Sequence, residues 1–477
     1  MRIAALCLLL CCCSLGPANA ASSTRSPKSW TVMIYMNAKN NLEEDALRNF
    51  EEIADVGSSE NVDIVVALGR LKDHPPDCEL CNRHPWGGVR FFHVEKGPEP
   101  EGRKPIRKLI VGDMGSPATL DEFVRFCRRN FGSRHYALII WGHGYGFSLL
   151  NAFRQMGIVK PAARIADSVQ SIAATPRGCD TPSGPEGNLK AVSNDPEFNH
   201  YLFNRQIEET LKNILGAGPK LDLLGFDACL MGSVEIAYGM RDIADYLVAS
   251  EDLVPSCSWT YYEPLQDLVK EADRMDGERL AREFVEAYRR KFADGPSFAT
   301  LSAIRLNRLD ALSTQISQLA TTLEHVSDAE LKAITRARNG CRVFGADDGY
   351  HNPIDLEQFL LILKPLLPND AEVREAISGV TSVLDSRGFV IDRFPGGDQA
   401  HGLTIYFPPT KRDFTENPDN EDNGAYNRSD CKDPIAKHAV EFVCSNSWSL
   451  FLPVYFTRTR SETAEERSPS NYLARTE

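Results

Sequence analysis

The sequence predicts an α/β fold built on a mostly parallel sheet, followed by a helix-rich C-terminal region. Over roughly the first 300 residues, short apolar runs alternate with amphipathic helical stretches, which is the pattern of parallel βαβ units. Two of the runs, Tyr136–Trp141 and Leu221–Phe226, are almost continuously apolar, as strands buried on both faces of a parallel sheet are. From about Leu309 consecutive amphipathic helices replace this alternation.

The first βαβ unit is predicted at Trp30–Met36, Glu43–Ile53 and Val62–Leu68, with the right-handed crossover expected of parallel strands. Thr119-Leu-Asp-Glu122 is typical of a capping box, whose side chains accept bonds from the free N–H groups at a helix start, and it predicts a helix over Leu120–Asn130. The other predicted strands are Val89–Val94, Tyr246–Ala249, Gly388–Ile391, Leu403–Phe407 and Leu450–Phe456, and the other predicted helices are Leu202–Leu215, Met231–Ala244, Glu278–Phe292, Leu309–His325, Asp328–Arg338, Leu356–Leu363 and Glu372–Leu384.

Composition and charge exclude some classes of function. The chain has 477 residues, of which 42% are apolar and 25% charged, values typical of a globular protein with more than one core. Its net charge is −13 and its basic residues are scattered. Nucleic-acid binding is therefore disfavoured, because phosphate contact needs a concentrated cationic face.

The N-terminus is predicted to be a signal peptide. Arg2 precedes the apolar run Ile3–Leu15, and Ala18-Asn19-Ala20 fits a small-x-small cleavage site. The alternative, an uncleaved membrane anchor, is disfavoured because the run is shorter than the ~18 apolar residues of a spanning helix. We therefore expect a mature chain that begins at Ala21, is secreted or periplasmic, and has no membrane association after cleavage.

Four of the thirteen cysteines lie in the signal peptide and nine remain, so at least one thiol is expected in the exported chain. Cys78-Glu-Leu-Cys81 is half of a zinc motif, and without a second pair at metal spacing a local disulfide or two surface thiols are favoured over zinc. Cys127 and Cys341 are expected to be structural.

His143 and Cys229 are the candidate reactive residues, since each follows a predicted buried strand where the apolar run stops. Ligands of open α/β sheets bind outside the carboxyl ends of the strands, so the two side chains can meet there. A thiol with an imidazole is the arrangement of a cysteine nucleophile and its acid/base partner. By itself, a cysteine after a buried strand is more often a small core residue.

Three motifs resemble, in this order, those of the clostripain family of cysteine peptidases, which belongs to the caspase-like group: Trp141-Gly-His-Gly144, Gly225-Phe-Asp-Ala-Cys-Leu-Met231 and Ala249-Ser-Glu-Asp252. The later His401–Pro408 is similar to a recurrent segment of that family, and the resemblance runs from about Trp30 to Thr457. It implies a caspase-like three-layer sandwich and an endopeptidase that favours Arg or Lys before the cleaved bond. It also implies Cys229 as nucleophile and His143 as acid/base. Family members are often calcium-dependent and made as zymogens cut between these two residues.

Further site residues follow from position. The backbone N–H groups of Gly144 and Cys229 are expected to face the developing oxyanion. Asp227, two residues before Cys229, is the expected carboxylate for a basic substrate side chain, and its alternative is a structural carboxylate. Glu251 and Asp252 are further substrate-binding candidates, for which helix capping or exposure is the alternative. The segment Pro255-Ser-Cys-Ser-Trp259 has serines and a cysteine where the family has a glycine-rich turn.

The predicted organisation is a signal peptide (1–20), a short linker (21–29), a caspase-like catalytic domain (30–305), a C-terminal helical and strand domain (306–457) and a disordered tail (458–477). The catalytic domain contains an insertion, 151–199, rich in Pro and Gly. Exposed loops of this kind are where proteases cut. Arg177 is the expected self-cleavage residue, with Lys160, Arg164 and Lys190 as rivals.

The sequence thus predicts an exported, monomeric cysteine endopeptidase that acts on polypeptides after Arg, or after Lys, and needs no cofactor for its chemistry. Calcium remains open, since Asp347, Asp348 and the acidic stretch at 419–422 are better explained as solvated loop charge, and no metal ligand is assigned. The alternatives are a catalytically silent binding protein of the same fold and a caspase-like peptidase that prefers Asn or an acidic residue. A disulfide-stapled adhesive protein is disfavoured by the regular βαβ pattern.

Overall fold

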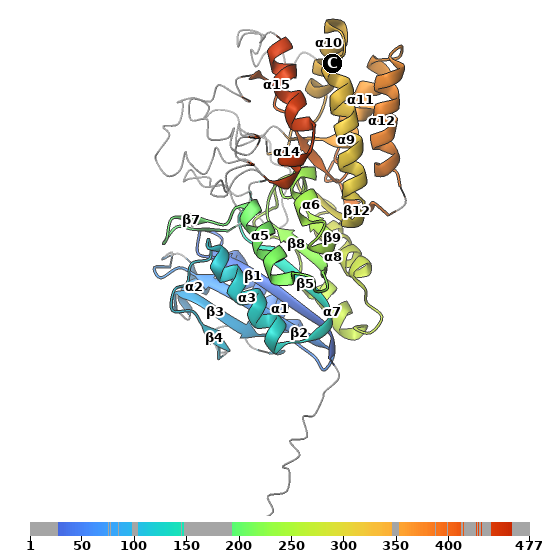
Figure 1. Cartoon of the computed structure of the whole chain (residues 1–477). Coiled ribbons are helices and arrows are strands. Elements are labelled where there is room, and N and C mark those ends of the chain that lie inside the picture. Colours follow the sequence, from blue (N-terminus) through green and yellow to red (C-terminus); the bar gives the residue numbers. More distant parts are fainter. Residues whose placement is uncertain are drawn as a thin grey trace, which may run out of the picture.

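A single nine-stranded sheet organises the described part of the chain, with the strand order β12-β10-β9-β8-β5-β1-β2-β3-β4 (Figure 1). The computed structural model describes residues 27–74, 76, 78–83, 85–97, 104–144, 146, 193–345, 353–386, 388–397, 399–411, 414, 426, 428, 431 and 440–459. The strands of this sheet are β1 (Lys28–Ala38), β2 (Val62–Arg70), β3 (Gly88–His93), β4 (Arg107–Lys108), β5 (Ser133–Trp141), β8 (Leu221–Asp227), β9 (Ala244–Ala249), β10 (Leu301–Arg305) and β12 (Val390–Phe394).

The centre of the sheet is parallel and its edges are antiparallel. β2, β1, β5, β8 and β9 run in the same direction, whereas β3 and β10 pair antiparallel with the outermost of them. Because parallel strands are covered on both faces, their sequences are almost uniformly apolar, and every residue of β2 is buried. The predicted α/β fold with a mostly parallel sheet is confirmed.

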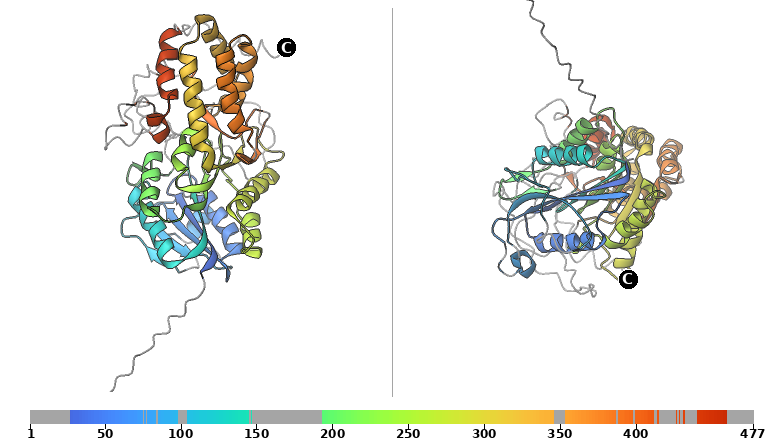
Figure 2. Two further views of the ribbon diagram at one scale, coloured as in Figure 1. Left: turned by 45° about the vertical axis from the view of Figure 1, so that its right-hand side comes forward. Right: turned by 90° about the horizontal axis from the view of Figure 1, so that it is seen from below.

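Helices cover both faces of the sheet, which gives three layers (Figure 2). Side chains alternate between the faces, so that Val32 and Ile34 of β1 belong to one core and Met33 and Tyr35 to the other. The first core is covered by α1 (Glu43–Val56), α7 (Tyr262–Lys270) and α8 (Gly277–Lys291), and the second by α3 (Pro117–Asn130), α5 (Asn204–Leu215) and α6 (Val234–Met240).

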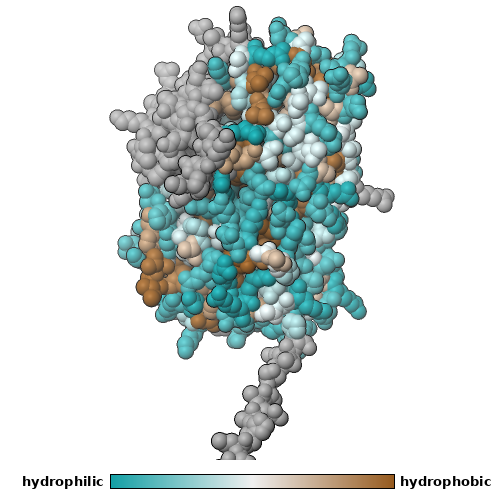
Figure 3. Space-filling model, in the orientation of Figure 1, coloured by the Kyte–Doolittle hydropathy of each residue, from teal (hydrophilic) through white to brown (hydrophobic). Residues whose placement is uncertain are grey.

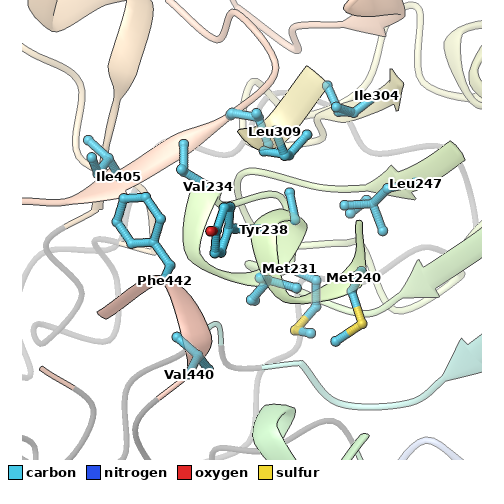
Figure 4. Close-up of a cluster of buried hydrophobic side chains, with 14 of the residues drawn as sticks. Met231, Val234, Tyr238, Met240, Leu247, Ile304, Leu309, Ile405, Val440 and Phe442 are labelled. Carbon is cyan, nitrogen blue, oxygen red and sulfur yellow. The ribbon is translucent and has the colours of Figure 1, made fainter. Parts of the chain in front are cut away.

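The C-terminal region is rich in helices and packs on the end of the sheet layer (Figure 1). Its main helices are α9 (Leu309–Glu324), α10 (Asp328–Asn339), α11 (Leu356–Leu366), α12 (Ala371–Leu384), α14 (Glu441–Ser445) and α15 (Trp448–Arg458). Figure 4 shows the junction, where Val234 and Tyr238 of α6 meet Leu309, Ile405 and Phe442 in a continuous buried cluster. The region also supplies β12 to the large sheet, while β11 (Pro353–Asp355) pairs with β13 (Thr404–Tyr406). The boundary at residue 305 remains a prediction.

Two local predictions are wrong. Leu450–Phe456 was expected to be a strand but lies in helix α15. The aromatic residues of this segment favour a strand. In α15, however, the buried apolar side chains recur at helical spacing: Trp448, Phe451, Leu452, Tyr455 and Phe456. Thr119 does not cap α3, because Pro117 starts the helix one turn earlier and the Ser116 side chain accepts the bond from the Ala118 N–H.

Most apolar side chains of the described residues are buried. On the face shown in Figure 3, hydrophilic residues predominate and hydrophobic ones form small separate groups. In the part of the chain that the structure describes, no helix is both long and apolar enough to span a bilayer.

Candidate active site

Two adjacent parallel strands deliver His143 and Cys229 to the same edge of the sheet. β5 pairs with β8 in a register that places Trp141 opposite Asp227. His143 and Cys229 each follow these partners by two residues. Equal offsets beyond a parallel pair bring both side chains to one rim, and both residues line the same pocket. The structure therefore brings the two candidate reactive residues together.

Gly144 packs directly against the backbone of the Cys229 loop. A Cβ atom placed on Gly144 would lie 2.3 Å from the Cys229 carbonyl oxygen and 2.6 Å from its nitrogen, so no side chain fits. On the other side of His143, the Gly142 N–H donates to the Asp227 carbonyl oxygen at 3.2 Å. The two strand-end loops are thus in backbone contact, with the predicted oxyanion residues Gly144 and Cys229 side by side.

Replacing Gly144 with Ala is expected to push the two loops apart. Overpacking typically costs about 1–3 kcal/mol, and a misplacement of about 1 Å at a reacting centre costs roughly 10²-fold in rate. We expect peptidase kcat/KM to fall by about that factor, with a lower Tm by thermal unfolding. Gly132→Ala, where an added Cβ meets nothing within 4 Å, is the matched control. Equal activity of the two variants would contradict the close contact.

The Cys229 side chain is a half-buried thiol. Its sulfur accepts a hydrogen bond from the Val254 N–H at 3.2 Å. The next residue, Leu230, has a left-handed backbone with a φ of 61°, and its N–H donates to the Asp252 carbonyl oxygen at 3.0 Å. The chain therefore turns sharply after Cys229, and the loop that follows β9 holds this turn.

His143 Nε2 lies 2.7 Å from Oδ1 of Asn41, which follows strand β1. Burial lowers the pKa of His143 to about 4, since desolvation disfavours the charged form. The imidazole is therefore neutral at physiological pH and can accept a proton from a thiol.

A small pocket of about 30 Å³ lies beside the two residues. Asp227 is among its lining residues and is itself 2% exposed. The pocket is lined by Leu42, Trp141, Gly142, His143, Asp227, Ala228, Cys229, Val254, Pro255, Ser256 and Ser258.

One oxygen of the Asp227 carboxylate is held by the protein. Its Oδ2 accepts from the Ser258 hydroxyl, from the Tyr261 hydroxyl at 2.8 Å and from the Trp259 N–H at 3.4 Å. No hydrogen-bond partner for Oδ1 lies among the described residues. Burial raises the pKa of Asp227 to about 6, although these bonds act against the shift. At neutral pH a carboxylate therefore lines the pocket, and its buried Oδ1 accepts no hydrogen bond from the described residues.

Comparison with known proteins shows the family to which the chain belongs. The model of the clostripain family matches residues 34–157 and 190–383, more than half of the sequence. The chain belongs to the clostripain family. Clostripain of Hathewaya histolytica is 26% identical over 237 residues, which span 47% of this chain and 39% of that protein. The chain thus matches well under two thirds of the length of this curated relative.

Two solved structures have the same fold. One is described as an inactive zymogen C11 protease from Parabacteroides distasonis, with 16% identity and a TM-score of 0.54. The other is a secreted C11 cysteine protease from Bacteroides thetaiotaomicron, with 15% identity and a TM-score of 0.54. Each match covers 80% of this chain and 93% of the solved chain. The predicted clostripain resemblance and caspase-like fold are confirmed.

The clostripain-family chain does not bring Glu251 and Asp252 to the pocket. Both are buried. Glu251 Oε2 accepts from the Gly402 N–H at 2.8 Å, and Asp252 forms an ion pair with Arg342 at 2.6 Å. These carboxylates join the end of β9 to the C-terminal region, and their contacts do not support substrate binding.

Ser258 is a pocket residue that was not predicted, although it lies in the segment that departs from the family's glycine-rich turn. Ser258 has a φ of 58°, a conformation that glycine adopts readily, and its hydroxyl reaches Asp227. Lys291 of α8 holds the segment that contains Ser258. Its Nζ donates to the carbonyl oxygens of Cys257, Ser258 and Trp259 at 2.7–3.1 Å.

The remaining cysteine and metal predictions have mixed outcomes. Of the two alternatives favoured over zinc for Cys78 and Cys81, the structure shows the local disulfide, and Cys127 and Cys341 are buried thiols, as expected of structural residues. Within the described ranges, no group of three or more His, Cys, Asp or Glu residues is arranged to hold a metal. The self-cleavage candidate Arg177 and the acidic candidates at 347–348 and 419–422 lie outside the described residues.

Proposed function

We propose that this chain is an exported cysteine endopeptidase that cleaves polypeptides after Arg, or after Lys, with Cys229 as nucleophile and His143 as acid/base. The observation that carries the substrate preference is the buried Asp227 carboxylate in a pocket beside Cys229, with Oδ1 unused by the described residues. One accepting oxygen suits an ammonium or a guanidinium N–H, and a buried charge of this kind favours a basic side chain. A fold shared with C11 cysteine proteases supports the reaction class.

In this mechanism the thiol of Cys229 gives its proton to the neutral imidazole of His143, and the sulfur attacks the scissile carbonyl carbon. The resulting oxyanion is stabilised by the N–H groups of Gly144 and Cys229, each typically worth about 3 kcal/mol. His143 then protonates the leaving amine, which departs and leaves a thioester. The imidazole next takes a proton from water, and the hydroxide formed attacks the thioester and releases the acid and the thiol.

The test is a panel of fluorogenic peptides ending in Arg, Lys, Asn or Asp, assayed with the wild-type protein with and without chelator. We expect cleavage of the Arg and Lys peptides only. Cleavage after Asn or Asp would instead support a different preference, and no cleavage of any peptide would support the silent binding protein. Loss of activity with chelator, restored by Ca²⁺, would establish a calcium requirement.

We also propose that the chain is exported through its signal peptide and activates itself by cleavage at Arg177 within the 151–199 insertion. The solved neighbours described as a zymogen and as secreted support this proposal by analogy. Purified wild type is expected to give two fragments on a reducing gel and Cys229→Ala one intact chain. Arg177→Gln should slow the cut, whereas Lys160→Gln, the matched control, should not. Identical banding of wild type and Cys229→Ala would rule out self-cleavage.

A further inference from the structure

The turn that follows β1 holds Asn41 beside the acid/base histidine. β1 pairs with β5 in parallel, with Met36 opposite Trp141, so both chains leave the sheet at the same edge. The Asn41 Oδ1 atom lies 2.7 Å from His143 Nε2. The adjacent Leu42 lines the same pocket as His143.

This contact sets the tautomer of His143. A side-chain amide oxygen can only accept a hydrogen bond, so Nε2 must carry the proton. In the neutral imidazole Nδ1 is then the basic nitrogen, the one that can accept the proton of a thiol. When the imidazole becomes cationic, its Nε2–H donates more strongly to the Asn41 oxygen. The bond therefore strengthens as the charge of the reaction develops.

Local hydrogen bonds shape the turn that carries Asn41. The Lys39 N–H donates to Oδ1 of Asn37 at 3.1 Å, and the Leu42 N–H donates to Oδ1 of Asn40 at 2.9 Å. Asn40 Nδ2 also donates to the carbonyl oxygen of Asn37 at 3.3 Å. Asn37 and Asn40 are both buried. Short side chains that bond the nearby backbone in this way are typical of a defined turn.

Buried ion pairs hold the turn on both sides of Asn41. The Lys39 ammonium is fully buried and lies 2.7 Å from Asp195 and 2.8 Å from Glu197. On the other side, Glu43 at the start of α1 pairs with the fully buried Arg70 at 2.7 Å. A catalytic group is held accurately only when its supporting residues are themselves fixed by packing and bonding. Asn41 is exposed, but its backbone is anchored by these buried neighbours.

We propose that Asn41 is a positioning residue that holds the His143 ring with Nε2 protonated, which makes Nδ1 its basic nitrogen. The inference rests on the proposed roles of His143 and Cys229 and adds a third residue, supplied by the strand next to β5. Asn41 touches neither substrate nor the reacting atoms and acts through His143.

The first test is Asn41→Ala, measured with the Arg reporter peptide. Because a loosened imidazole is misaligned, we expect kcat to fall by roughly 10- to 100-fold. KM should change by less than about twofold, because the pocket that contains Asp227 is intact. Asn61→Ala is the matched control, since Asn61 precedes β2 at the opposite end of the sheet and is also exposed. Thermal unfolding should give the same Tm for both variants.

The second test is Asn41→Asp, which keeps an acceptor for Nε2 and adds a negative charge. The charge stabilises the imidazolium and raises the pKa of His143. We expect most of kcat to be retained and the pH profile of kcat/KM to move to higher pH. A residue that served only the fold would not move this profile.

Several outcomes would overturn the proposal. Wild-type kcat and pH profile in Asn41→Ala, with His143→Ala inactive, would show that Asn41 does not position His143 while leaving the peptidase function intact. A change in KM alone would make Asn41 a substrate contact instead. Activity in His143→Ala would refute the proposed mechanism and this inference together.

Discussion

Replacing Cys229 with Ala is expected to lower peptidase kcat/KM by roughly 10⁴-fold or more, because removing a nucleophile removes the covalent step. His143→Ala should lose a comparable factor, since the thiol then lacks its proton acceptor. The double variant should be little worse than either single one, because residues that act as a unit are not additive. Initial rates with the Arg reporter peptide measure all three.

Cys341→Ala is the matched control for loss of a thiol. Cys341 is buried, and its thiol donates to the Ala337 carbonyl oxygen, so the change affects packing and leaves the pocket unaltered. We expect near-normal activity and a modest decrease in Tm. An Arg-directed, thiol-reactive probe should label wild type and Cys341→Ala but not Cys229→Ala. Labelling that persists in Cys229→Ala would assign the nucleophile to another residue.

The second large loss of activity is expected for Asp227→Asn, which removes the negative charge from the pocket. Leaving a buried charge unpaired costs about 3–5 kcal/mol, so we expect kcat/KM for Arg and Lys peptides to fall by roughly 10²- to 10³-fold. The side chain keeps nearly the same size and can still accept from Ser258 and Tyr261. Labelling of Cys229 by iodoacetamide, a small neutral reagent, should be unchanged. Equal losses of labelling and of peptide cleavage would show that Asp227 supports the nucleophile and does not recognise the substrate.

Burial raises the pKa of Asp227 to about 6, which predicts that peptidase activity falls at acidic pH. Below about pH 6 the carboxyl is protonated and should bind a basic side chain poorly, so wild-type kcat/KM should fall on the acid side of that value. The residual kcat/KM of Asp227→Asn should not show this fall at acidic pH.

The raised pKa of Asp227 also makes the stability of the folded protein depend on pH. Here the sign is opposite, because ionisation of Asp227 favours substrate binding but disfavours folding. A carboxyl whose pKa is higher in the folded than in the unfolded state binds more protons when folded, so stability falls as pH rises from about 4 to about 6. Above pH 6 the ionised Asp227 destabilises the free protein. Asp227→Asn should therefore have a higher Tm than wild type at pH 8, with a smaller difference at pH 4. A lower Tm at pH 8 would contradict this.

Much of the fold and the centre of the site could be predicted from the sequence. Continuous apolar runs such as Tyr136–Trp141 predict buried parallel strands, and this signal is local to each strand. His143 and Cys229 stand where two runs end, and the carboxyl ends of parallel strands share one edge of the sheet. Their convergence in one pocket therefore followed from the strand pattern without knowledge of the contacts.

Other features depended on residues far apart in the chain. Ser258 and Tyr261 bond to Asp227 across more than 30 positions, and Asn41 reaches His143 across 102. Glu251 and Asp252 follow the end of β9, where site residues are expected. Their carboxylates instead bond to Gly402 and Arg342 of the C-terminal region. No local pattern encodes such pairings, since they depend on the register of strands and on the loops that pack beside them.

The sequence by itself determined which strands are buried and which two reactive side chains end them, because burial and periodicity are properties of consecutive residues. Only the tertiary structure decided that Oδ2 of Asp227 is the oxygen held by Ser258 and Tyr261, that Asn41 lies beside His143 Nε2, and that the strand-like Leu450–Phe456 is helical. Each of these outcomes is set by a hydrogen bond or a packing contact with a distant segment.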